Sequence, residues 1–282
     1  MVVVHLKNVD YKEEKKNKKK IRKKMNTLSC IETHIQKNHN HYGCFIIEPL
    51  EVGQGITLGN TLRRTLLSDL YGYGITGVRI NNVKHEFAII EGIREDVLEL
   101  ILNLKEVTFK GSAIKKNKKP KRFKGFLHLK GPMIVTAGLF QLPNKELTIL
   151  NPSQYLCTII DDSELYLEID IENGKGYRLI EENRRRKIER AIFLKKPTTL
   201  FVDTVFVPIK HVNYKVKLIH DSYGNIKESL IFEIGTNGSF TPKRCIKEAL
   251  KIILKLFYSL FLTETFFPIS KLLKDETNEL KK

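Results

Sequence analysis

The amino-acid sequence predicts an α+β fold, in which runs of strands are punctuated by three helices. Apolar residues recur every three to four positions in long segments, as on one face of a helix, while other short segments have the pattern of strands. No regular strand–helix–strand alternation links these segments, which disfavours a doubly wound parallel sheet. At 282 residues, the chain is long enough for one large domain or two modest ones.

The first predicted helix runs from about Thr57 to Leu70. Its apolar stripe has a spacing of four residues and consists of Leu58, Leu62, Leu66 and Leu70. At about 100° per residue, Arg63 flanks this stripe and Arg64 falls on the opposite side. A Tyr-Gly-Tyr-Gly stretch at 71–74 is expected to end the helix.

Strands are predicted between and after the helices, and the Asn81-Asn82 pair is expected to join two of them into a hairpin. Further turns are expected at 174–177 and 223–225. The predicted strands span 27–35, 43–50, 76–80, 83–90, 126–130, 133–136, 146–149, 155–160, 164–171, 200–207, 211–219 and 229–234.

Two further helices are predicted. The second follows Glu95 and Asp96, which suit the positive end of a helix dipole, and its expected apolar face is Val97, Leu98, Ile101 and Leu102. Thr241 is expected to cap the last helix, with Pro242 at its first position. The broad apolar face of that helix comprises Ile246, Ala249, Leu250, Ile253, Phe257, Leu260 and Phe261.

The net charge of +17 is concentrated in three segments. Residues 1–25 hold ten Lys/Arg against three acids, 110–130 nine against none, and 181–196 seven against three, so the remainder is slightly acidic. We interpret these segments as a disordered tail and two solvated loops. The alternative is attraction to a phosphate backbone, although Phe123 and Phe126 are too few aromatic residues for a stacking platform.

Cysteine and histidine spacing predicts neither disulfides nor a metal site. The four cysteines, Cys30, Cys44, Cys157 and Cys245, form no C-x-x-C pair, and no histidine lies at ligand spacing from them. We therefore expect reduced thiols and a non-secretory protein. No membrane association is expected, because the longest apolar run, 252–262, is short and interrupted by Lys255.

The glycine-rich turn before the first helix resembles a phosphate-binding loop in outline only. Its Gly53-x-Gly55-x-x-x-Gly59 spacing does not match the dinucleotide fingerprint, and no Gly-Lys-Ser/Thr ends it. We interpret these glycines as a tight entry turn with close packing. Arg64 is either solvated or bound to a partner protein, since arginine is enriched at interfaces.

No catalytic constellation is predicted. The sequence contains neither H-E-x-x-H nor G-x-S-x-G, and Asp161-Asp162 would point to opposite faces of a strand. Two helices with broad apolar faces exceed what one modest sheet can cover, which favours self-association. The residues alone therefore indicate a non-catalytic, dimeric assembly protein with basic appendages.

Four segments carry a resemblance to a known family. They are IIEPLEVGQGITLGNTLRRTLLSDL, VRINNVKHEFAIIEGIREDVLELILNLK, GKGY and EIGTNGSFTPKRCIKEAL. In this order and spacing, over roughly 40–105 and 170–262, they resemble the amino-terminal domain of the α subunit of bacterial-type, DNA-directed RNA polymerase. The resemblance implies a subunit of a nucleotidyltransferase that itself carries no catalytic residue.

The resemblance also implies the organisation and partners of the chain. A discontinuous dimerisation subdomain would comprise 26–72 and 198–265, and a mostly β subdomain, 73–197, would be inserted with the basic loop 110–125. The homodimer would assemble the β and β′ subunits and meet DNA and RNA only through the holoenzyme. No cofactor is implied for this chain, because magnesium is expected in β′.

Residue roles are implied by position in the matching motifs. Contact with the β subunit and assembly would involve Arg63, Arg64, His85, Glu86 and Lys105, and contact with β′ would involve Val202 and Asp203. The implied dimer interface consists of Leu58, Leu62, Leu66, Leu70, Ile246, Leu250, Ile253 and Phe257.

The sequence also departs from the family pattern. A charged tail, 266–282, stands where bacterial members carry a linker and a DNA-binding carboxy-terminal domain, which we expect to be absent. Together with Lys-, Ile- and Asn-rich composition, this favours a plastid-encoded chloroplast protein, with the bacterial cytoplasm as the alternative. The alternative function is a free-standing basic nucleic-acid-binding protein of ribosomal type, based on the charged segments.

Overall fold

The computed structural model describes residues 27–36, 39–111, 122–142, 146–191, 199–221 and 223–261, with the backbone alone at 187–191. The predicted basic extension, most of the basic loop and the charged tail lie outside these residues. Within them the chain is a mixed α+β protein, which confirms the predicted class.

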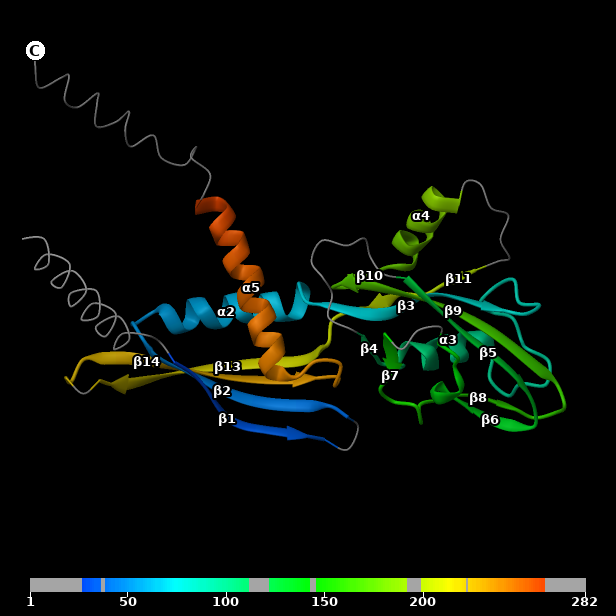
Figure 1. Ribbon diagram of the computed structural model, residues 1–282, viewed down its shortest axis with the longest axis horizontal. Coiled ribbons are helices and arrows are strands. Elements are labelled where there is room, and N and C mark those ends of the chain that lie inside the picture. The colour runs from blue at the N-terminus through cyan, green and yellow to red at the C-terminus, as the bar shows by residue number, and fades with distance from the viewer. Residues whose placement is uncertain are drawn as a thin grey trace, which may run out of the picture.

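One four-stranded antiparallel sheet has the order β1-β2-β14-β13. Its strands are β1 (Thr27–Ile35), β2 (His41–Leu50), β14 (Ile226–Thr236) and β13 (Ile209–His220). Two helices, α2 (Gln54–Ser68) and α5 (Pro242–Phe261), lie over the same face of this sheet (Figure 1). Inward side chains of the sheet and of both helices form one hydrophobic cluster, with Phe45, Leu62, Phe232 and Ile246 among its members.

A second four-stranded sheet has the order β11-β3-β9-β5. Its strands are β11 (Leu200–Phe201), β3 (Tyr71–Ile80), β9 (Glu164–Lys175) and β5 (Arg122–Lys130). Three short strand pairs accompany it: β4 (Phe109–Gly111) with β7 (Leu147–Ile149), β6 (Met133–Thr136) with β8 (Tyr155–Ile159), and β10 (Tyr177–Arg178) with β12 (Thr204–Val205).

The second hydrophobic cluster lies between this sheet and α3 (Val97–Lys105), with the short 3-10 helix η1 (Ala137–Leu139) at its edge. All its fully buried members come from residues 75–202. A further helix, α4 (Ile180–Ala191), lies on the side of the sheet away from α3 (Figure 1). The chain therefore forms two separate hydrophobic cores. Residues up to about 70 and from about 209 onward form the first core, and the segment between them forms the second.

Several predicted elements differ from the structure. The stretch 71–74 begins β3 instead of merely ending a helix, because Gly72 lets the strand lie directly against the carbonyl of Phe206, where a Cβ would collide. Segment 83–90 is not a strand: β9 pairs along one edge of β3, and β11 occupies the other edge at Gly77 and Val78, where a hairpin would have to continue. Asn82 does adopt the expected positive φ, 61°.

The buried face of α3 and the conformation of the arginine run also differ from the prediction. The buried face of α3 is Val97, Leu100, Ile101 and Leu104, so Leu98 and Leu102, predicted to be buried, are exposed. The arginine run lies on a helix, α4, and not in a loop. Asp96 lies at the N-terminus of α3 as expected, and its side chain caps the helix by accepting a hydrogen bond of 2.7 Å from the backbone N–H of Glu99.

Candidate partner-binding surfaces

The glycine loop before α2 is held by a carboxylate of the chain itself. Gly53 has φ of 88°, and its N–H donates to Oε1 of Glu228 at 2.9 Å. The N–H of Gly55 donates to Oε2 of the same side chain at 2.7 Å. Glu228 is buried on β14 and takes the position at the helix N-terminus that a phosphate takes in a nucleotide-binding loop. The loop is therefore a structural anchor.

Helix α2 packs by one face and presents two arginines on the other. Leu62 and Leu66 are fully buried, and Gly59 lies against the ring of Tyr214 on β13. Arg63 and Arg64 are exposed, and neither side chain forms an ion pair with any of the described residues. Both guanidinium groups therefore lie on the exposed side of α2, where the sequence predicts Arg64.

The structure divides the residues predicted for a dimer interface. Leu62, Leu66, Leu70 and Ile246 belong to the core of the single chain and have no surface left for a partner. The prediction is wrong for these four, because a stripe that faces the sheet cannot also face outward. Leu58 and Ile253 are partly buried against the same core, whereas Leu250 and Phe257 are exposed.

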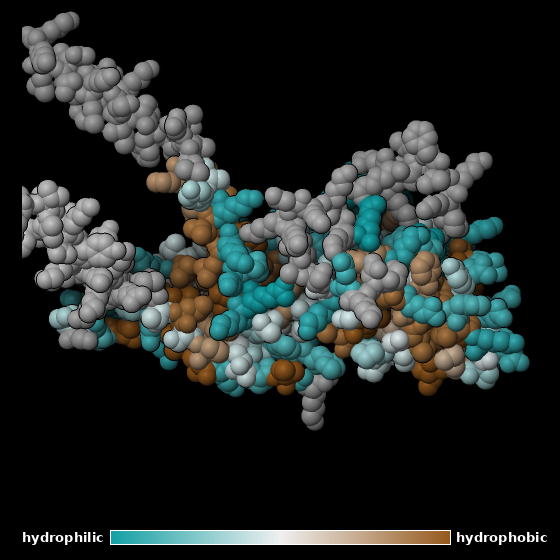
Figure 2. Space-filling view, viewed as in Figure 1, coloured by the Kyte–Doolittle hydropathy of each residue, from teal (hydrophilic) through white to brown (hydrophobic). Residues whose placement is uncertain are grey.

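The second half of α5 carries an apolar surface that the chain does not cover. Leu254 is 67% exposed and Phe261 84% exposed, and Leu250 and Phe257 lie on the same side of the helix. Figure 2 shows this surface as a brown strip along α5 beside teal residues. The polar flank is formed by Lys247, Lys251 and Lys255. Among the described helices, none is long and apolar enough to span a membrane.

Two of the residues predicted to contact β and β′, Lys105 and Asp203, form an ion pair. Lys105, at the end of α3, lies 3.7 Å from Oδ2 of Asp203, while Oδ1 of Asp203 accepts the N–H of Ile180 at the start of α4. His85 is exposed and Glu86 half-buried in the segment after β3. Val202 is 1% exposed, so its predicted contact with β′ is wrong; its side chain belongs to the core.

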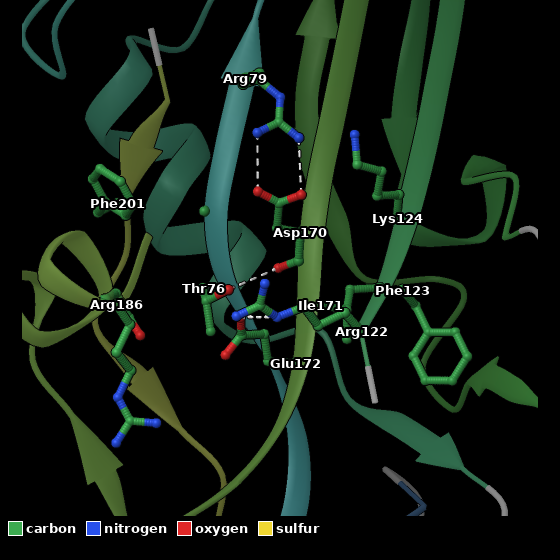
Figure 3. Close-up of a pocket in the computed structure, with 12 residues that line it drawn as sticks. Thr76, Arg79, Arg122, Phe123, Lys124, Asp170, Ile171, Glu172, Arg186 and Phe201 are labelled. Atoms are coloured by element: carbon green, nitrogen blue, oxygen red, sulfur yellow. Dashed lines mark hydrogen bonds and ion pairs between the residues drawn. The ribbon is translucent and has the colours of Figure 1, made fainter. Parts of the chain in front are cut away.

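The outer face of the second sheet carries a charged surface that the sequence did not predict. Arg79 on β3 is buried and paired with two carboxylates of β9, those of Glu168 and Asp170, at 2.7 and 2.8 Å. Figure 3 shows the pair with Asp170. A recess of about 320 Å³, hereafter the Arg79 recess, opens beside them, and its lining includes Thr76, Arg79, Arg122, Lys124, Asp170 and Arg186. Alternating acids in 164–172 and bases in 122–130 were the signal that could have revealed this surface.

Similarity to known proteins agrees with this architecture. Residues 78–207 match the family described as RNA polymerase Rpb3/RpoA insert domain, a span close to that of the second core. The chain is 44% identical over 233 residues to the DNA-directed RNA polymerase subunit alpha of Pyropia yezoensis, covering 83% of this chain and 70% of that protein. It belongs to the RNA polymerase alpha subunit family.

Other alpha subunits are similarly related. That of Rhodomonas salina is 44% identical over 83% of this chain and 69% of its own length, and that of Trichormus variabilis 42% identical over 82% and 69%. As an alpha subunit, the chain is a non-catalytic part of the enzyme that transcribes DNA into RNA. Relatives in plastid-bearing algae and cyanobacteria indicate a plastid or bacterial origin, and family membership replaces the ribosomal-type alternative.

Proposed function

We propose that this alpha subunit forms a homodimer through α5, and that the dimer assembles the β and β′ subunits of RNA polymerase. The observation that carries the proposal is the exposed apolar surface on the second half of α5. Large uncovered apolar patches on a soluble protein are characteristic of protein interfaces.

A second copy of the chain suits this surface. Leu250, Leu254, Phe257 and Phe261 fall within an arc of roughly 60° around the helix. Burial of one such side chain is worth about 1.5–3 kcal/mol. The four are 38, 67, 59 and 84% exposed, so what remains to be buried equals about two and a half side chains. They offer a gross gain of roughly 4–7 kcal/mol per protomer, from which the cost of association is subtracted. A two-fold axis brings the same stripe of both copies together, so that apolar surface meets apolar surface.

We also propose a two-part organisation, in which the sheet under α2 and α5 serves dimerisation and an inserted part serves contact with other subunits. The two separate hydrophobic clusters support this division. Leu200 and Val202 pack in the second cluster, so we move the later boundary from residue 198 to about residue 207.

Recruitment of the β subunit is assigned to Arg64, with Arg63, His85 and Glu86 as further contacts. An exposed arginine with no ion pair among the described residues can meet a carboxylate of a partner bidentately. Lys105 and Asp203 pair with each other, so their contacts with β and β′ would be adjacent. We assign magnesium to β′ and the site of action to a plastid.

Native mass measurement of the full chain, alone and mixed with β, tests both assignments. Leu254→Asp should convert the dimer to a monomer, because it places a charge in the apolar stripe. Ser259→Asp is the matched control: it adds the same carboxylate on a different, exposed side of α5 and should leave the dimer intact.

Arg64→Ala should leave the dimer intact while greatly reducing recovery of β. Lys130→Ala, which removes an exposed cation from the other sheet, serves as its control. A dimer that survives Leu254→Asp would refute the role of α5. Unchanged recovery of β with Arg64→Ala would refute the role of α2.

A further inference from the structure

The outer face of the second sheet carries a ladder of opposite charges. In β9, Ile169 and Ile171 point into the core. Asp170, which lies between them, and Glu172, which follows them, therefore point outward. β5 pairs with β9 in a register that sets Arg122 opposite Glu172 and Lys124 opposite Asp170. Opposite charges on one face of neighbouring strands stabilise the pairing.

Two of the outward carboxylates, those of Glu168 and Glu172, are each shared between two cations. Glu168 binds Arg79 and also accepts from Lys124 of β5. Glu172 accepts from Arg122 and from Arg178, each at 2.9 Å. Shared carboxylates leave part of the positive charge uncompensated.

The Arg79 recess lies where this ladder meets α4 (Figure 3). Arg122 and Lys124 reach it from β5, and Arg186 reaches it from α4. Arg186 is exposed and forms no ion pair with the described residues. Its guanidinium is therefore available to a ligand.

The charge around the recess is positive. Among the described residues, three carboxylates, those of Glu168, Asp170 and Glu172, face five cations, which are Arg79, Arg122, Lys124, Arg178 and Arg186. A hollow lined by surplus charge of one sign concentrates the field and attracts the opposite charge. A phosphate group carries about −1.5 to −2 at neutral pH, which matches the surplus.

We propose that the Arg79 recess binds a phosphate group, with Arg186 and Arg122 as its direct contacts. Arginine suits this role, because its planar fork binds two phosphate oxygens at once. Arg79 and Lys124 are positioning residues: they hold the carboxylates of β9 and keep the floor of the recess rigid. The site is separate from α2 and α5, so it does not depend on the proposed assembly function.

Neighbouring arginines on α4 provide a matched experiment. Arg185 and Arg186 are both exposed, but only Arg186 lines the recess. Arg185→Gln and Arg186→Gln remove the same charge from the same helix. Binding of inorganic pyrophosphate and of a single-stranded oligonucleotide is measured by titration calorimetry with the full chain in about 0.1 M salt, where long-range attraction is screened beyond about 10 Å.

We expect Arg186→Gln to weaken binding at least tenfold and Arg185→Gln to leave it nearly unchanged. Binding of pyrophosphate with this pattern identifies a small phosphorylated ligand as the source of the phosphate. Binding of the oligonucleotide alone with this pattern identifies a nucleic-acid backbone. Equal losses in the two variants, or no binding of either probe, would overturn the proposal, because diffuse charge does not distinguish neighbouring arginines.

Arg122→Gln provides a second, independent variant. It should also weaken the binding that Arg186→Gln weakens, while circular dichroism verifies that the sheet is retained. Loss of binding with Arg186→Gln but not with Arg122→Gln would refute the assigned contact of Arg122.

Discussion

At the scale of single residues, the buried Arg79 organises the charged face of the second sheet. Its guanidinium donates to both oxygens of Glu168 and both of Asp170. The hydrogen bond from Arg79 is the main cause that lowers the pKa of Glu168 from 4.5 to about 2, and Lys124 adds to it, while burial opposes it. Burial of these charges costs desolvation free energy, which offsets much of their attraction. Removal of one partner is therefore strongly destabilising, because it leaves a buried charge without compensation.

This depressed pKa predicts acid sensitivity. Because the unfolded carboxylate takes up its proton at higher pH than the folded one, the contribution of Glu168 is complete above about pH 5 and is lost as pH falls towards 2. Glu168→Gln should lower the free energy of unfolding at pH 7 by roughly 3 kcal/mol and flatten its dependence on pH. Urea unfolding at pH 7 and pH 3 measures both effects.

Glu164→Gln is the control for that measurement. Glu164 lies on the same strand, and its side chain is 62% exposed beside His128, so its removal should change the free energy of unfolding by less than about 0.5 kcal/mol. Equal losses in the two variants would contradict the role assigned to the Arg79 pair.

The sequence revealed single residues only where a local period places them. Arg64 could be assigned to the exposed side of α2 because a helix repeats every 3.6 residues. The role of Arg79 could not, because its partners lie 89 and 91 positions away, and no local pattern shows which strands become neighbours. The ion pair between Lys105 and Asp203 could not be predicted for the same reason, because these residues are also far apart in the sequence.

At the scale of elements, close backbone approach fixes how α2 sits on its sheet. A Cβ added at Gly59 would lie 2.6 Å from Cδ2 of Tyr214 on β13. Glycine lets the helix approach the aromatic ring, while Glu228 anchors the preceding loop from β14. The two contacts together set the position of α2, and with it the direction of Arg64.

Gly59→Ala should therefore destabilise the protein, although alanine is favoured over glycine in a helix by about 1 kcal/mol. Overpacking costs about 1–3 kcal/mol, so we expect a net loss of up to about 2 kcal/mol in urea unfolding. Asn60→Ala, at the exposed neighbouring position, should be neutral or slightly stabilising.

A double variant identifies the cause of this loss. If Tyr214 is the obstacle, Gly59→Ala combined with Tyr214→Leu loses less stability than the two single changes added together. Strict additivity would mean that the ring does not limit the approach of α2.

The prediction of helices and strands was correct where the local sequence pattern is strong. It was wrong where the pairing between distant strands determines the structure. Strand β1 has the predicted bounds, 27–35, and Pro242 begins α5 as expected. Segment 83–90 has strand-like composition, yet β9 pairs along one edge of β3 and β11 takes the other at Gly77 and Val78. Helix α4 was missed because its first two turns carry charged residues and almost no apolar stripe.

At the scale of the whole molecule, one chain forms two hydrophobic cores, and an ion pair connects the elements around them. Asp69, directly after α2, pairs with Lys175 at the end of β9, with an Nζ–Oδ1 distance of 3.0 Å. Strand β3 leads from α2 into the second sheet, and the segment after β12 returns to β13. The α+β class followed from the sequence. The two-part organisation is a proposal, and its later boundary rests on the packing of Leu200 and Val202 in the second cluster.

Separate cores predict separate responses to core substitutions. Leu167 on β9 and Leu230 on β14 are both fully buried, one in each cluster. Replacement of such a leucine by alanine costs about 2–5 kcal/mol of stability.

Leu167→Ala should lower amide hydrogen-exchange protection in β3, β5 and β9. It should leave protection in β13 and β14 and the native mass of the dimer unchanged, because opening of one unit need not open the other. Leu230→Ala should do the reverse and weaken the dimer, because α5 packs on the cluster that contains Leu230. If either variant lowers protection equally in both sheets, the chain unfolds as one cooperative unit, and the proposed division into a dimerisation part and an inserted part is wrong.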